Sequence, residues 1–196
     1  MLEKISLAVS YISEPFFTST LAFGLVLLKV DANLNDKIAW GLMALIFGAL
    51  PPIIIYIYEK RVGKIKDWMI TNRIERRDVH LAWIFGSALL SIIYWQLDVP
   101  RLLIAFTLSL FALSIVITLA TLLWKISVHI VGVTMLVLTL LLVYSSTYLF
   151  GVLIIGVVAW SRIYIGHHTL SQVTAASVLT IIVIYYVFSQ FGLATF

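Results

Sequence analysis

The 196-residue chain contains no cysteine, which excludes disulfide bonds, thiolate nucleophiles and metal sites built from cysteine. Charge is also scarce. Asp, Glu, Lys and Arg make up 11% of the sequence, whereas an ordinary soluble domain has roughly a quarter. No Asp or Glu occurs after Asp98. A carboxylate that serves the second half of the chain must therefore come from the first half.

Apolar residues take the place of the missing charge. They make up 62% of the chain, and the mean hydropathy is +1.10. Apolar runs recur at about 20 residues, the length of helix that crosses the hydrocarbon core of a bilayer. The sequence therefore predicts one integral membrane domain over 1–196, an all-α polytopic bundle of about seven helices with six as the alternative count. The expected segments are 5–30, 38–58, 81–97, 101–124, 127–144, 148–164 and 169–191.

Prolines predict irregularities within these segments. Glu14-Pro15 lies inside the first run, so we expect a broken helix there, with Glu14 either near the membrane interface or in a functional site. The run is also too long and too interrupted for a cleavable signal peptide. Pro51-Pro52 should kink the second segment or end its first half. Asp98-Val99-Pro100 predicts a tight turn that makes a helical hairpin of 81–124.

The distribution of basic residues predicts the orientation. With seven spans, the N-terminus and three polar clusters emerge on one face, which carries ten of the thirteen Lys and Arg residues. The opposite face has only Lys29, Lys37 and Arg101. The positive-inside rule places the clusters on the cytoplasmic side of the cell membrane. Because the basic residues flank apolar runs, they indicate a lipid bilayer rather than a nucleic-acid partner.

The first cluster lies in the long polar stretch 59–80, where an amphipathic helix over about 65–77 is expected. Lys66 and Arg73 are seven residues apart, close to two helical turns, and would share a face. A lysine and an arginine form a suitable clamp for phosphate oxygens. Binding to anionic lipid headgroups explains the same pattern equally well. The second cluster, Ser127-Val128-His129, opens a segment, with Ser127 as a candidate N-cap.

The third cluster, Ser161-Arg162-x5-His168, carries the most specific pattern. Gly166 permits a sharp turn, after which His168 lies at a helix N-terminus that would stabilise an attached phosphate. Gln172, four residues on, either accepts the Nδ1 proton of His168 or closes a capping box with the residues that precede it. His167 could exchange roles with His168, although the spacing to Gln172 favours His168.

In this order and spacing, the clusters resemble the tripartite signature of the type-2 phosphatidic-acid phosphatase superfamily, membrane lipid-phosphate phosphatases related in fold to vanadium haloperoxidases. The resemblance covers the clusters and the helices around them. It implies a nucleophile that forms a phosphohistidine, His168, and a general acid, His129. It also implies that Lys66, Arg73, Ser127 and Arg162, together with Ser161 of the same motif, hold the phosphoryl group. No metal or other cofactor is required.

Three features depart from that family. Ile74 replaces a proline, Ile126-Ser127-Val128-His129 replaces Pro-Ser-Gly-His, and Gln172 stands where the family usually has an aspartate that orients the nucleophile. We expect the neutral Gln172 to slow the chemistry or shift its pH optimum. The hairpin 81–124 resembles an insertion into the usual arrangement.

The sequence thus predicts hydrolysis of a phospholipid monophosphate or an isoprenoid mono- or diphosphate, with the lipid tail entering from the bilayer. Transfer of the phosphoryl group to another acceptor is a related possibility. The alternative from another class is a non-catalytic lipid-binding or carrier protein that retains the fold. The sequence does not predict an oligomeric state.

Overall fold

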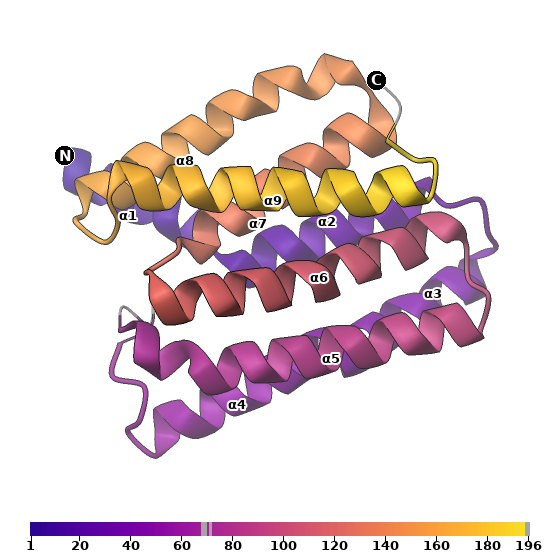
Figure 1. The fold of residues 1–196 in the computed structure, drawn as a ribbon, viewed down its shortest axis with the longest axis horizontal. Helices are drawn as coiled ribbons and strands as arrows, with labels where there is room; N and C mark the ends of the chain where they lie inside the picture. The colour runs from indigo at the N-terminus through magenta and orange to yellow at the C-terminus, as the bar shows by residue number, and fades with distance from the viewer. Residues whose placement is uncertain (68–69, 71, 195–196) are drawn as a thin grey trace. The chain divides into compact units, whose positions relative to one another are not determined.

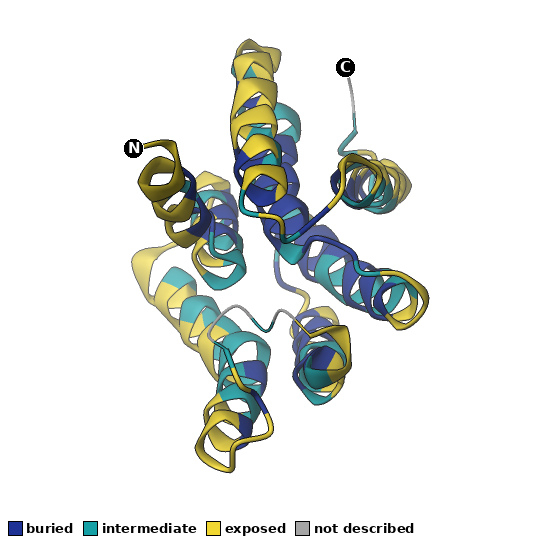
Figure 2. Cartoon of the chain, turned by 90° about the vertical axis from the view of Figure 1, so that its left-hand side faces the viewer, coloured by how far each residue is buried: buried dark blue, intermediate teal, exposed yellow. Residues whose placement is uncertain are grey.

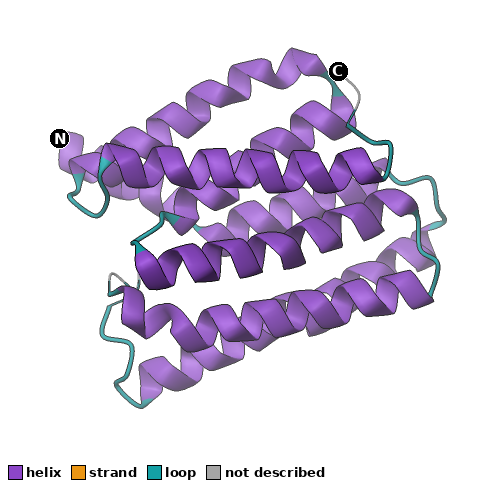
Figure 3. Ribbon diagram, in the orientation of Figure 1, coloured by secondary structure: helices purple, strands orange, loops and turns teal. Residues whose placement is uncertain are grey.

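The computed structural model describes residues 1–67, 70 and 72–194, and every regular element within them is a helix (Figures 1 and 3). The predicted all-α class is confirmed. The α-helices are α1 Leu2–Ile12, α2 Pro15–Lys29, α3 Leu34–Met43, α4 Leu50–Arg61, α5 Arg77–Gln96, α6 Arg101–Leu123, α7 Val128–Thr139, α8 Val152–Tyr164 and α9 Leu170–Gln190. Single π-helical turns extend α3 (Ala44–Ala49) and α7 (Leu140–Tyr144), and 3₁₀ turns precede α5 (Arg73–Arg76) and α8 (Ser146–Gly151).

Among the described residues, five helical stretches are long and apolar enough to cross a membrane, or six if α1 and α2 form one span bent by 48°. The apolar helix Val128–Tyr144 is shorter. These elements fit a multi-pass helical membrane protein with five or six candidate spans, so the predicted count of about seven is not confirmed and the alternative of six is reached only with the bent pair. Figure 2 shows exposed faces on several helices, and α9 exposes large apolar side chains, as lipid-facing helices do. They are Leu170, Val178, Ile181, Ile182, Tyr185 and Tyr186.

The chain divides into two compact units. The first combines Met1–Lys29 with Trp124–Phe196 and contains α1, α2, α7, α8 and α9. The second is Val30–Leu123 and contains α3 to α6.

Helix α7 is the centre of the first unit. It packs against α2, α8 and α9, and nearly all of its residues are buried. This agrees with its composition, because a helix that is apolar on all sides belongs in a core. Gly132 lets α2 approach closely, since a Cβ at this position would collide with the side chain of Thr18.

The expected break in the first segment is confirmed, because α1 ends at Ile12 and α2 begins at Pro15. The side chain of Glu14 caps the second helix. Its Oε2 atom accepts hydrogen bonds from the backbone N–H groups of Phe16 at 2.8 Å and Phe17 at 3.1 Å. Glu14 therefore satisfies two of the N–H groups that lack a partner at the start of a helix.

In the second unit, α5 and α6 form the predicted hairpin, joined through a turn in which Asp98 has a φ of 47°. Helix α5 also packs against α4 and against the π-helical turn Ala44–Ala49. Pro51 and Pro52 provide no N–H, so they cannot donate to the carbonyls of Phe47 and Gly48 four residues earlier. The helical run Leu34–Arg61 accommodates the prolines through this wider turn rather than ending at them.

Candidate functional site

A tight turn between α8 and α9 presents His168. The carbonyl of Arg162 accepts hydrogen bonds from the backbone N–H groups of His167 at 3.2 Å and His168 at 3.1 Å. Gly166 lies between Arg162 and His167 in the chain and has a φ of 71°, a backbone conformation that favours glycine. The predicted sharp turn at Gly166 is thus present. It places His168 two residues before the first residue of α9.

Gln172 makes both of the contacts that the sequence left as alternatives. Its Oε1 atom lies 3.2 Å from Nδ1 of His168 and accepts a hydrogen bond from the Thr169 N–H at 3.1 Å. Thr169 completes the capping box by accepting from the Gln172 N–H. A backbone N–H can only donate, so the glutamine atom beside it must be the carbonyl oxygen. That oxygen can only accept, and His168 therefore donates through Nδ1.

This contact fixes the tautomer of a buried side chain. His168 is 6% exposed, and its neutral ring carries the proton on Nδ1, so Nε2 is the nitrogen with the lone pair. A lone pair on Nε2 is what a nucleophilic histidine needs.

His167 has the opposite tautomer. Its Nδ1 atom lies 2.9 Å from Nη2 of Arg162. A guanidinium only donates, so Nδ1 of His167 accepts and the proton of the neutral ring is on Nε2. The two adjacent histidines are therefore distinguished by their partners: His167 faces Arg162 and His168 faces Gln172.

Arg162 is 1% exposed and is held by α1 as well. Its Nη1 atom donates to the hydroxyl of Ser10 at 3.1 Å. The hydroxyl of Ser161 donates to the carbonyl of Ser6 at 2.6 Å and lies 2.9 Å from that of Ser10. Because Ser161 has given its only proton to Ser6, the proton between the two hydroxyls comes from Ser10. A directed chain thus runs from Arg162 through Ser10 and Ser161 to Ser6.

This chain changes the interpretation of Ser161, for which the sequence predicts a phosphate contact. Phosphate oxygens accept hydrogen bonds, and the single hydroxyl proton of Ser161 is committed to α1. In this arrangement Ser161 joins α8 to α1 instead of donating to a ligand.

The second cluster opens α7. Ser127 is at the N-cap position and its carbonyl accepts from Val131 at 3.1 Å, but its side chain makes no capping bond, contrary to the sequence expectation. The Ser127 hydroxyl is buried and has no hydrogen-bond partner among the described residues. His129 follows in the first turn of α7 and is 5% exposed.

The second and third clusters belong to the same end of the first unit. Helices α7, α8 and α9 alternate in direction, so the start of α7, the end of α8 and the start of α9 lie at one end, on the left of Figure 1. The six predicted residues Ser127, His129, Ser161, Arg162, His168 and Gln172 are all found there. Ser127 donates to no described residue, Arg162 contacts the hydroxyl of Ser10, and His168 contacts the amide of Gln172.

The first cluster belongs to the second unit, and the helix expected over 65–77 is wrong for its described residues. Helix α4 ends at Arg61, Gly63 and Ile70 have positive φ values, and helical structure resumes only at Arg73. Residues 68, 69 and 71 lie outside the described residues. Lys66 and Arg73 therefore do not share the face of one helix.

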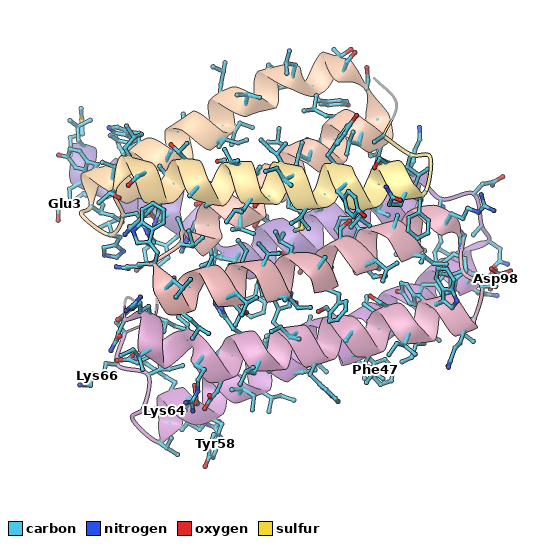
Figure 4. The ribbon with its side chains drawn as sticks, viewed as in Figure 1. Glu3, Phe47, Tyr58, Lys64, Lys66 and Asp98 are labelled. Atoms are coloured by element: carbon cyan, nitrogen blue, oxygen red, sulfur yellow. The ribbon has the colours of Figure 1, made fainter. Side chains whose placement is uncertain are left out.

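Both cations of the first cluster are exposed. The backbone N–H of Lys66 donates to Glu75 at 3.1 Å, and its side chain extends outward (Figure 4). Arg73 donates through Nη1 to the carbonyl of Leu122, near the end of α6, at 3.1 Å.

Lys64 stabilises the same loop by linking α4 to α5. Its ammonium group forms salt bridges with Asp78 and Glu59, which raise the pKa of Lys64 above its ordinary value of 10.5. A raised pKa means that the contribution to stability is fully present below pH 10.5. It is lost only as the pH rises through the higher value in the folded protein.

Two groups of residues were not assigned to the site by the sequence patterns. Ser6 and Ser10 are separated by four residues and thus lie on one face of α1, which is a signal for a buried polar contact. His167 was considered only as a substitute for His168, although it is the residue that contacts Arg162.

Comparison with known proteins identifies no relative: no family model matches the chain, and neither a curated protein nor a solved structure matches it. Among the described residues, no group of three or more His, Asp or Glu side chains is placed to hold a metal ion.

Proposed function

We propose that the protein is an integral membrane lipid-phosphate phosphatase in which His168 is the nucleophile. The observation that carries the proposal is the environment of this residue. His168 is buried at the start of α9, its Nδ1 is bound by Gln172, and the buried guanidinium of Arg162 belongs to the same turn. A lone pair on Nε2, a cation and a helix N-terminus together suit attack on a phosphoryl group.

The reaction follows from these groups and from the roles that the family resemblance implies. Nε2 of His168 attacks phosphorus, and the bond from phosphorus to the leaving oxygen breaks while His129 gives that oxygen a proton. Water then attacks the phosphohistidine and gives a proton to His129. The N–P bond breaks, its electron pair returns to Nε2, and inorganic phosphate leaves.

Stabilisation of the transferred phosphoryl group is the main task of the remaining residues. Phosphoryl transfer depends on positioning and on offsetting the charge of the equatorial oxygens. Arg162 supplies a fixed cation, Ser127 supplies a buried hydroxyl, and the first turn of α9 supplies N–H groups and a favourable dipole. The resemblance assigns further phosphate contacts to Lys66 and Arg73.

The substrate class follows from the apolar surroundings. The helices expose large apolar side chains, so a lipid tail can remain in the bilayer while its headgroup reaches the polar ends of the helices. Phospholipid monophosphates and isoprenoid mono- or diphosphates both satisfy this requirement. If an alcohol replaces water at the phosphohistidine, the same residues perform phosphotransfer.

The proposal includes seven spans, with Val128–Tyr144 as the additional one. At 1.5 Å per residue its 17 residues extend about 25 Å, at the lower limit for a span. With this helix counted, the N-terminus and all three clusters lie on one face, and the excess of Lys and Arg makes that face the cytoplasmic side of the cell membrane.

One observation favours a second candidate, a lipid-binding or carrier protein without activity. Gln172 is neutral, so it stabilises a charged imidazolium less than a carboxylate would. Such a protein would still hold an anionic headgroup through Arg162.

The test is phosphate release by the purified protein in detergent with phosphatidic acid, phosphatidylglycerol phosphate and short isoprenoid diphosphates. We expect His168→Ala to reduce release by at least about a thousandfold, as the loss of a nucleophile does. His80→Asn is the matched control, because His80 is a buried histidine that contacts Thr118 in the second unit. Activity that survives in His168→Ala would refute the mechanism. Phosphate binding without turnover would favour the carrier.

A further inference from the structure

Helix α1 places a polar residue against the most buried cation of the protein. Ser10 is completely buried, and its hydroxyl accepts a hydrogen bond from Nη1 of Arg162, a residue 152 positions later in the chain. The rest of α1 is largely apolar and exposes residues such as Leu2, Ile5 and Ile12. A buried serine that accepts from a buried guanidinium therefore stands out on this largely apolar helix.

We propose that Ser10 is a positioning residue that fixes the guanidinium of Arg162 for the phosphoryl group, so that α1 is part of the anion site. The inference rests on the proposed function, which makes Arg162 a ligand of the substrate. It adds a residue that lies outside all three sequence clusters and comes from the opposite end of the chain.

The chemistry of the contact requires a hydroxyl. Ser10 must accept from Arg162 and at the same time donate to Ser161, whose own proton goes to Ser6. Alanine can do neither, whereas threonine can do both. The chain of hydrogen bonds ends on a backbone carbonyl of α1, so the orientation of the guanidinium is tied to the backbone rather than to a mobile side chain.

The guanidinium is held from a second side as well. Nη2 of Arg162 donates to His167 while Nη1 donates to Ser10, and together these bonds set the plane of the group. A donor that is oriented before the substrate arrives needs no reorganisation during the reaction. If Ser10 is removed, Arg162 keeps its charge but loses this orientation, which weakens its bonds to the phosphoryl oxygens.

Kinetics in detergent with the most active lipid phosphate from the panel test this role. Because Arg162 touches the phosphoryl group in the bound substrate as well as in the transition state, we expect Ser10→Ala to raise KM and the inhibition constant of inorganic phosphate. The expected decrease in kcat/KM is about tenfold to a hundredfold, the range for one hydrogen bond to a charged group. Ser10→Thr should recover most of the loss.

Ser13→Ala is the matched control. Ser13 is also a buried serine and is the C-cap of α1, but its hydroxyl donates to backbone carbonyls of that helix, to Val9 at 2.8 Å and to Ser10 at 3.4 Å. We expect its kcat/KM to stay within about twofold of the wild type. If Ser10→Ala has wild-type constants, or if Ser13→Ala loses as much as Ser10→Ala, the inference is wrong.

Thermal unfolding with and without inorganic phosphate provides a readout that does not depend on turnover. Phosphate should raise the melting temperature of the wild type and of Ser13→Ala, and it should raise that of Ser10→Ala less. Absence of turnover together with this pattern would refute the phosphatase but support the role of Ser10. Turnover together with equal melting-temperature shifts in all variants would support the phosphatase but refute the role of Ser10. If Ser10→Ala does not fold, Ser10→Cys serves instead, because a thiol is a weak hydrogen-bonding group.

Discussion

At the scale of single residues, one side-chain carbonyl oxygen accepts two of the hydrogen bonds that define the candidate site. Oε1 of Gln172 accepts from the ring of His168 and from the backbone of Thr169, so the same atom sets the tautomer of His168 and helps to cap the start of α9. From the sequence alone, these two contacts of Gln172 were alternative interpretations. The structure shows that they coexist, because a carbonyl oxygen has two lone pairs.

The neutral partner of His168 leads to a prediction for Gln172→Asp. A carboxylate stabilises the charged imidazole of the intermediate state better than an amide, so kcat should rise by about tenfold, the equivalent of about 1.4 kcal/mol. The carboxylate also favours the protonated ring, which cannot attack phosphorus. The acidic limb of the pH–rate profile should therefore move to higher pH.

Steady-state kinetics from about pH 4 to about pH 9 measure both effects, because this interval includes the range in which histidine titrates. Gln172→Glu is the control, since it keeps the chain length and adds the charge. Identical pH–rate profiles for the wild type and Gln172→Asp would show that the amide does not limit the reaction.

At the scale of helices, glycine allows α5 to approach the π-helical turn in the second unit. A Cβ on Gly86 would lie 2.5 Å from the carbonyl oxygen of Phe47, one of the two carbonyls to which the prolines cannot donate. The backbone oxygen cannot rotate away as a side chain would. Any side chain at position 86 would therefore force the two helical segments apart, and only glycine fits this packing.

Gly86→Ala should consequently destabilise the protein by about 1 to 3 kcal/mol, the usual cost of overpacking. Gly156→Ala is the control, because Gly156 lies within α8 and a Cβ there has nothing within 4 Å. Alanine at that position should be neutral or stabilise by up to about 1 kcal/mol through helix propensity. Melting temperatures in the same detergent measure both changes. Equal melting temperatures for the two variants would contradict the close contact.

Much of the helical architecture could be predicted from the sequence, because long apolar runs and their interruptions are local signals. The break at Glu14-Pro15, the hairpin turn after Asp98 and the turn at Gly166 all follow from residues with a known backbone effect. The helix expected over 65–77 was wrong because charge spacing alone cannot exclude an irregular loop. Its described residues bond within the loop, as Lys66 does with Glu75.

The candidate site could be predicted only in part. The spacing of Arg162, His168 and Gln172 is local, and the contact between His168 and Gln172 is present. The contacts of Ser10 with Arg162 and of Ser161 with Ser6 join opposite ends of the chain, and the sequence contains no signal for which distant helix is the partner. Serine is favoured at N-caps, but the buried Ser127 side chain makes no capping bond, so the preference of the residue type did not predict its contacts.

At the scale of the whole molecule, the number of spans decides which polar clusters share a face. The cysteine-free sequence makes this directly testable, because each introduced cysteine is the only thiol. We expect an impermeant maleimide to label Val62→Cys and Ser171→Cys from one side of sealed vesicles. It should label Asn35→Cys and Ser146→Cys from the other side.

Ser146 is the decisive position, because it follows Val128–Tyr144. If that helix does not cross the membrane, Ser146→Cys will be labelled from the same side as Val62→Cys, and Ser171→Cys from the opposite side. Labelling of all four variants with a permeant maleimide confirms that each thiol is accessible.

The hydrogen bond between Ser10 and Arg162 also has a consequence for biosynthesis. The two residues are separated by 152 positions, so at ordinary rates of translation the ribosome adds Arg162 about 8 to 30 seconds after Ser10. During that interval α1 is already made, but the arginine that it contacts has not yet been added. The proposed anion site would thus form late, after the ribosome has completed α8 and this helix has met α1.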